Sequence, residues 1–179
     1  MTRLALATAA CLALAACEND PSEVAAMFPD ERPDAEILTG FETIYSDSAQ
    51  IKVRVTGERL VRTREGAEYV QEFPEGVFVE FFDDSGAVSA TLAARWGIRY
   101  EGQELITVRD SVVWQAVGGD RLDTDELIYD AAAERIYSDR FVRLRQGEKV
   151  ITGVGFESNP EFTRSRVRAV RGVVTVPRP

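Results

Sequence analysis

The side chains in this sequence that could do chemistry are carboxylates. Two acidic clusters stand out, Asp83 with Asp84, and Asp123 with Asp125 and Glu126. A pair of carboxylates can hydrolyse a glycosidic bond when the two groups face each other across a cleft. These residues, however, are sequence neighbours at or beside predicted turns, where Asp is favoured because its side chain hydrogen-bonds the local backbone. The clusters therefore predict turns and not a catalytic pair.

The sequence contains no histidine, which is the commonest general base near neutral pH and a frequent zinc ligand. The serines have no visible base. Gly153 and Gly155 lie among alternating apolar residues, outside the context of a phosphate-binding loop, and predict a bend or a bulge. We therefore expect no enzyme activity, no catalytic residue, no metal site and no cofactor.

One residue with reactive chemistry remains, Cys17. Arg3 and the apolar run 4–14 are typical of an export signal, and the run is too short for a convincing membrane span. Residues 14–17, Leu-Ala-Ala-Cys, resemble the lipobox of bacterial lipoproteins, in which the cysteine is acylated and becomes the first mature residue. Cys11 lacks this context. We expect a signal peptide over 1–16 and a lipid anchor on Cys17. With more than one acyl chain attached, release of the protein from the membrane would be negligible.

Residues 17–34 are rich in Asp, Glu, Pro and Ser and predict a flexible tether. A single folded domain follows, over 35–179. Without the signal peptide the chain has 20 basic and 30 acidic residues, a net charge of −10. This charge argues against nucleic acid as a partner and against electrostatic docking on anionic lipid.

The tether leads into short apolar strands separated by acidic or glycine turns. Gly86, Gly119 and Gly147 mark three of these turns, 33 and 28 residues apart. A period of this size is typical of stacked hairpins, each of which needs its neighbours to bury an apolar face. After the first turn, apolar residues occupy every second position, which predicts one strand with an apolar face: Val88, Ala90, Leu92, Ala94, Trp96, Ile98 and Tyr100. The fold class is therefore all-β, elongated and antiparallel.

Five short motifs in a fixed order, together with the lipobox and the acidic tether, resemble the lipid-anchored branch of the LptC lipopolysaccharide-export family. The motifs cover 44–47, 73–77, 122–130, 136–139 and 155–159. The resemblance implies a twisted β-jellyroll, open along one side, whose apolar trough receives the lipid A acyl chains of lipopolysaccharide. It also implies two partners, an inner-membrane ABC transporter of the LptF/LptG type at the N-terminal edge and an LptA-like bridge protein at the C-terminal edge.

The same resemblance implies a periplasmic location, most simply at the inner membrane, although Glu18 after the anchor is not a decisive sorting signal and leaves the outer membrane open. Well-studied relatives contact the transporter through a transmembrane helix, and a lipid anchor stands in its place here. Two rival functions stay open: a β-sandwich that binds carbohydrate or a protein partner, and a structural lipoprotein without a ligand.

A stack that stays open along one side exposes apolar interior positions, which suits acyl chains. We expect six residues to line the trough: Val79, Phe81, Leu92, Trp96, Ile98 and Trp114. The alternative is that these side chains are ordinary core. The strand at the C-terminus has no visible cover and should be the docking edge for the bridge protein, through Val173, Val174, Thr175 and Val176.

Overall fold

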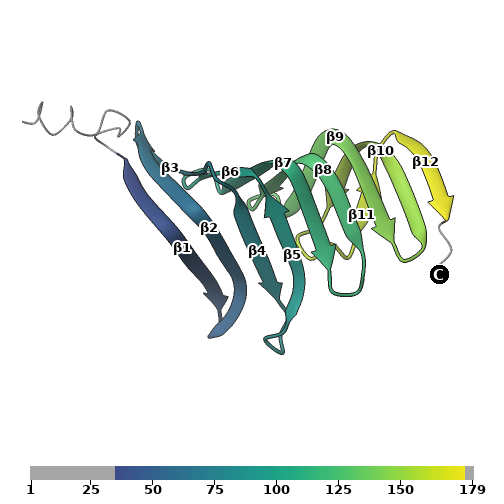
Figure 1. Ribbon diagram of the computed structural model, residues 1–179, viewed down its shortest axis with the longest axis horizontal. Helices are drawn as coiled ribbons and strands as arrows, with labels where there is room; N and C mark the ends of the chain where they lie inside the picture. Colours follow the sequence, from purple (N-terminus) through teal and green to yellow (C-terminus); the bar gives the residue numbers. More distant parts are fainter. Residues whose placement is uncertain (1–34, 176–179) are drawn as a thin grey trace, which may run out of the picture. The chain divides into compact units, whose positions relative to one another are not determined.

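The computed structural model describes residues 35–175, which form one antiparallel sheet of twelve strands and contain no helix (Figure 1). The all-β prediction is confirmed. The predicted signal peptide, the tether, Cys17 and Val176 lie outside the described residues. The strands are β1 (Glu36–Asp47), β2 (Gln50–Glu65), β3 (Glu68–Phe73), β4 (Val77–Phe82), β5 (Val88–Ala94), β6 (Trp96–Tyr100), β7 (Leu105–Ala116), β8 (Arg121–Asp130), β9 (Arg135–Gln146), β10 (Lys149–Ser158), β11 (Ser165–Val167) and β12 (Val170–Thr175).

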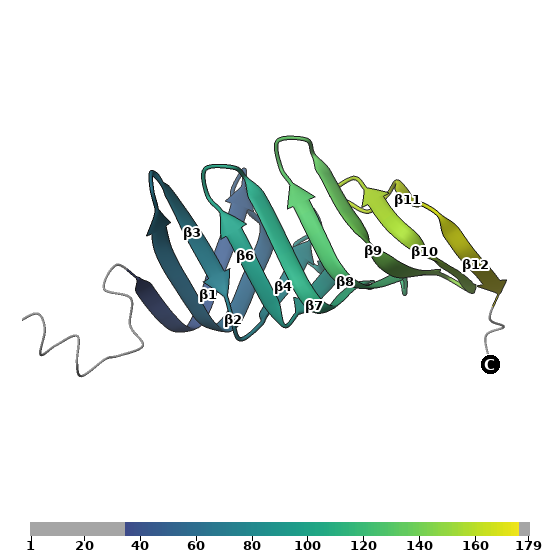
Figure 2. The same cartoon turned by 90° about the horizontal axis from the view of Figure 1, so that it is seen from above.

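The long strands each contribute to two walls of the folded sheet. The start of β2 pairs with β4, and its end pairs with β3. Strand β7 likewise pairs with β6 through its first half and with β5 through its second. We call the wall that contains β4, β5 and β12 the β5 wall, and the wall that contains β3, β6 and β11 the β6 wall. Figure 2 shows the blue N-terminal strands at one end of the sheet and the yellow strand β12 at the other.

The walls meet along a bend where the long strands change direction. Strand β7 bends at Asp110 and Ser111, whose φ angles are 61° and 57° and where the pairing register shifts. Strand β10 bends at Gly155, which has a φ of 87°, and the pairing register with β9 shifts between Val154 and Phe156. The bend or bulge predicted for this glycine is confirmed. A Cβ on Gly57 would lie 2.6 Å from the Phe41 ring, so the close approach of strands along the bend requires glycine there.

The turns opposite the bend contain the glycines that the sequence analysis identified. Gly86, Gly119 and Gly147 have φ angles of 81°, 99° and 57°. At the first of these turns, the Asp83 carboxylate accepts hydrogen bonds from the backbone N–H groups of Ser85 and Ala87, at 2.8 and 3.1 Å. A hydrogen bond from the Ser85 hydroxyl is the main cause that lowers the pKa of Asp83. The turn prediction for Asp83 is confirmed.

The second acidic cluster was predicted at or beside a turn, and it lies instead inside β8. The Arg121 guanidinium holds the Asp123 carboxylate at 2.6 Å. The Glu126 carboxylate is buried at the bend and contacts Arg109 at 2.6 Å and Arg140 at 3.5 Å. Glu126 therefore links β8 to β7 and β9 by ion pairs, whereas the pair of Arg121 with Asp123 lies within β8.

The core lies between the two walls. Leu122, Val142 and Phe156 have no exposed surface. Most of the surrounding cluster alternates along the strands, as expected when each strand buries one face. Its buried members are Phe41, Leu60, Phe73, Val77, Ala90, Leu92, Ala94, Val108, Val112, Trp114, Leu122, Leu127, Ile136, Val142, Leu144 and Phe156.

The predicted single strand from Val88 to Tyr100 is wrong. The chain breaks at Arg95, and β5 and β6 belong to different walls. The alternation of inward and outward residues reverses at this break. Gly97 shows the reversal: a Cβ on it would lie in the core, 3.2 Å from the Phe73 ring and 3.5 Å from Val108.

The reversal places Trp96 and Ile98 on the outer face of the β6 wall, so their inward assignment is also wrong. The Trp96 ring nitrogen, Nε1, donates a hydrogen bond to the Glu72 carboxylate at 2.9 Å. The Arg109 guanidinium carbon lies 5.3 Å from the centre of the Trp96 ring. Both polar contacts are consistent with the outward position of this tryptophan.

Candidate functional site

A row of directly opposed apolar residues crosses the inner face of the β5 wall. The pairing registers place Val79 opposite Leu92, Leu92 opposite Trp114, and Trp114 opposite Leu122. We call the full set the apolar row: Val55, Val79, Leu92, Trp114, Leu122, Leu144, Ile151 and Val173. It crosses eight strands, so at about 4.8 Å per strand it is roughly 34 Å long.

The apolar row includes three of the six residues predicted to line the trough, namely Val79, Leu92 and Trp114. Phe81 lies beside it on the same face, packed against the core and opposite Ala90. The middle of the row is buried, because the β6 wall covers it with Val108, Leu127 and Phe156. Its last residue, Val173 on the edge strand β12, is 54% exposed. The row therefore connects the core with the C-terminal edge of the sheet.

Phe162, which the sequence analysis missed, lies against the centre of the apolar row. Its ring stacks on the Trp114 ring with 3.9 Å between centroids and 9° between planes. Its centroid is 6.0 Å from that of Phe156. Phe162 belongs to the loop between β10 and β11, in the β6 wall, and so links the two walls. The one signal in the sequence is a large apolar residue within the otherwise polar segment 159–164.

The rim of the β6 wall near this loop is acidic. Tyr129 packs partly against the core, and burial is the main cause that raises the pKa of its hydroxyl. The carboxylates of Glu134, Glu104 and Glu161 raise it further. Tyr129 therefore stays protonated across the physiological range and can serve as a neutral, amphipathic residue at this rim.

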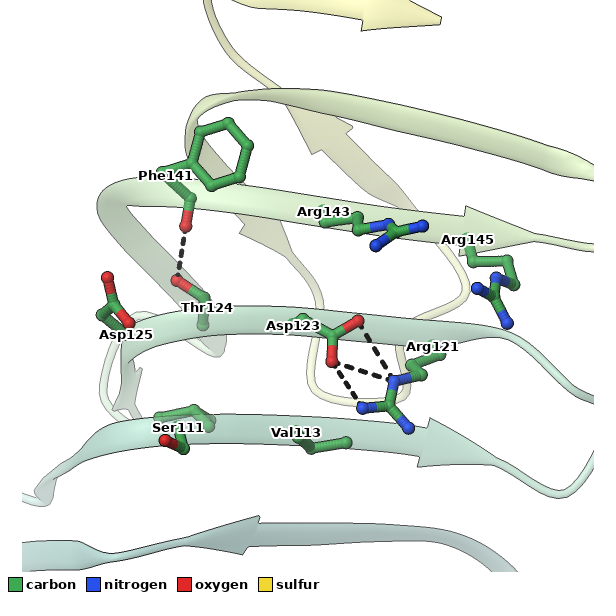
Figure 3. Close-up of a pocket in the computed structure, with 10 residues that line it drawn as sticks. Ser111, Val113, Arg121, Asp123, Thr124, Asp125, Phe141, Arg143 and Arg145 are labelled. Carbon is green, nitrogen blue, oxygen red and sulfur yellow. Dashed lines mark hydrogen bonds and ion pairs between the residues drawn. The ribbon is translucent and has the colours of Figure 1, made fainter. Parts of the chain in front are cut away.

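A separate hollow of about 510 Å³ lies on the outer face of the β5 wall, over β7, β8 and β9. Figure 3 shows Arg143 and Arg145 extending from β9 beside the ion pair of Arg121 with Asp123. Phe141 forms part of the same hollow and is 49% exposed. Because the hollow is lined by charges of both signs and lies on the outer face, it cannot continue the apolar row of the inner face.

Edge strands bound the sheet at both ends. Among the described strands, β12 pairs only with β10, and β1 pairs only with β2. Val173 and Val174 on β12 are exposed, as are Leu38, Ile44 and Tyr45 on β1, and Thr175 beside them is exposed as well. Each end therefore presents an unpaired backbone edge with apolar side chains, which is the usual template for strand addition.

The fold and the apolar row define an elongated, jellyroll-like antiparallel β protein with an apolar inner surface. The chain matches the family model described as "Lipopolysaccharide-assembly, LptC-related" over residues 4–173, and it belongs to this family. A comparison with curated proteins found no match. Family membership implies a part in lipopolysaccharide transport, at a periplasmic location associated with the inner membrane. Within residues 35–175, no helix is long and apolar enough to cross a membrane.

Proposed function

We propose that this protein is a non-enzymatic carrier that receives lipopolysaccharide from an inner-membrane ABC transporter and passes it to an LptA-like bridge protein. The acyl chains of lipid A lie along the apolar row. The observation that carries the proposal is the continuity of this row from β2 to the exposed Val173 on β12. A core that served stability alone would have no need to continue onto an exposed edge strand.

The bridge protein docks on the free edge of β12 by strand addition, through Val173, Val174, Thr175 and Val176. The apolar row then continues into the partner's sheet. Four or five backbone hydrogen bonds at roughly 1 kcal/mol net each give a contact that forms and dissolves readily. The transporter contacts the opposite edge, β1, where Leu38 and Ile44 are exposed.

Cys17 anchors the protein to the membrane through its acyl groups. Cys17→Ala should abolish labelling by radioactive palmitate and leave an unprocessed precursor, because the lipobox context surrounds this cysteine alone. Cys11→Ala is the matched control and should label as strongly as the wild type. Palmitate incorporation that persists in the Cys17 variant would refute the anchor.

Extraction of bound lipid from the purified protein tests the proposed function. Mass spectrometry should detect lipid A in the wild type and little in Leu92→Glu, because the new carboxylate would lie within the apolar row. Ala93→Glu changes the neighbouring, outward-facing residue and should retain the lipid. Bound carbohydrate in place of lipid would favour a sugar-binding module, and the absence of any ligand would favour a structural lipoprotein.

A further inference from the structure

The Phe162 ring occupies a position that a bound acyl chain would need. Trp114 lies near the middle of the apolar row, and the Phe162 ring covers one face of it at 3.9 Å. This separation is the ordinary contact distance between carbon atoms. A polymethylene chain that followed the apolar row would contact Trp114 at the same distance, and the ring and the chain therefore compete for one surface.

The backbone at Phe162 is strained. Its φ angle is 55°, and it is the one aromatic residue among the eight non-glycine residues with positive φ in the described range. Bulky residues rarely adopt this conformation. Such strain, of order 1–3 kcal/mol in general, persists only where the surrounding structure imposes it. Its neighbours Glu161 and Thr163 are exposed, so this position directs one apolar ring inward from a polar loop.

The β10–β11 loop, residues 159–164, holds its shape through its own hydrogen bonds. The Asn159 amide donates to Glu161 at 2.5 Å and to Thr163 at 2.8 Å. The Asn159 side-chain oxygen accepts from the Arg164 backbone N–H at 2.8 Å, and the Asn159 carbonyl accepts from the Phe162 N–H at 3.0 Å. These bonds do not involve the β5 wall. The loop can therefore withdraw the ring from Trp114 without losing them.

We propose that the space filled by the Phe162 ring, between Trp114 and Phe156, is a subsite for a saturated acyl chain. The β10–β11 loop closes this subsite in the lipid-free protein and opens when a chain enters. The proposal rests on the proposed function and adds to it the residue that an incoming chain must displace. Phe162 thus lowers acyl affinity and keeps Trp114 covered while the carrier is empty.

Quenching of Trp114 fluorescence by dibrominated stearate tests the subsite. Trp96→Phe removes the other of the two tryptophans and reports Trp114 alone. In this background, Phe162→Ala should reach half-maximal quenching at about two- to tenfold lower stearate concentration, the range expected for loss of one aromatic contact. Phe141→Ala makes the same chemical change on the outer face, where Phe141 is exposed, and should leave the midpoint unchanged.

Equal midpoints in the parent and the Phe162→Ala protein would overturn the subsite and leave the proposed function intact, because stearate would still reach Trp114. Failure of stearate to quench any of the proteins would overturn both. Phe162→Leu keeps an apolar side chain without the stacking and should shift the midpoint in the same direction by a smaller factor. This variant decides the question if Phe162→Ala does not fold, and an unshifted midpoint in it would then reject the subsite.

Discussion

Phe156→Ala is expected to lower the free energy of unfolding by about 3–5 kcal/mol, the usual loss for a large aromatic side chain removed from a core. Phe156 has no exposed surface and packs against the core where β10 bends, next to Gly155. The surrounding side chains come from both walls, so they cannot collapse into the cavity without moving the bend. Urea unfolding followed by circular dichroism measures the loss.

Phe141→Ala is the matched control for stability. Phe141 is 49% exposed, and its backbone carbonyl, which accepts a hydrogen bond from the Thr124 hydroxyl at 3.0 Å, is unchanged by the substitution. Its loss should stay below about 1 kcal/mol. Similar losses for the two variants would mean that the interior is not packed as described.

Proline at whichever of Val173 and Val174 directs its N–H to the free edge of β12 is expected to weaken binding of the bridge protein by about five- to 150-fold. In an antiparallel strand, neighbouring residues direct their backbone N–H groups to opposite edges. Of Val173→Pro and Val174→Pro, one therefore removes an N–H that faces the free edge of β12, and the other removes one that faces β10. Proline at the free edge deletes a docking hydrogen bond. The carbonyl of the bridge protein that would have accepted it is left unsatisfied, which costs about 1–3 kcal/mol of binding free energy.

The two proline variants should be separable by their stability. The variant that faces the free edge should lose binding and keep the unfolding midpoint of the wild type, and the other should lower the midpoint as well. Val174→Thr keeps the backbone and should bind almost normally. If both proline variants fold and retain the affinity of the wild type in a pull-down with the bridge protein, β12 is not the docking edge.

The sequence predicted the glycine turns and the faces of several strand residues, because these depend on local residue types. Gly86, Gly119 and Gly147 have the positive φ angles that favour glycine, and Leu92 follows simple alternation within β5. The prediction from alternation failed after Arg95. There the chain passes from one wall to the other, and Trp96 and Ile98 face outward. The apolar residues keep the same every-second spacing on both sides of Arg95, so the sequence gives no sign of this break.

The apolar row and Phe162 could not be predicted from residue types alone. The row depends on how eight strands align, and bulges near Asp110 and Gly155 shift that alignment. Phe162 lies in a polar loop, and its contact with Trp114 depends on where the loop folds relative to the other wall. Both features are properties of the register and the bend, which are set by tertiary structure.

Photocrosslinking from β4 tests most directly whether acyl chains lie against the inner face. Phe81 and Phe78 are on the same strand and carry the same side chain, but Phe81 packs toward the core and Phe78 is 43% exposed on the outer face. A photoreactive phenylalanine at Phe81 should capture lipopolysaccharide in cells, and the same group at Phe78 should capture little. Equal capture at the two positions, or capture at Phe78 alone, would contradict transport along the inner face.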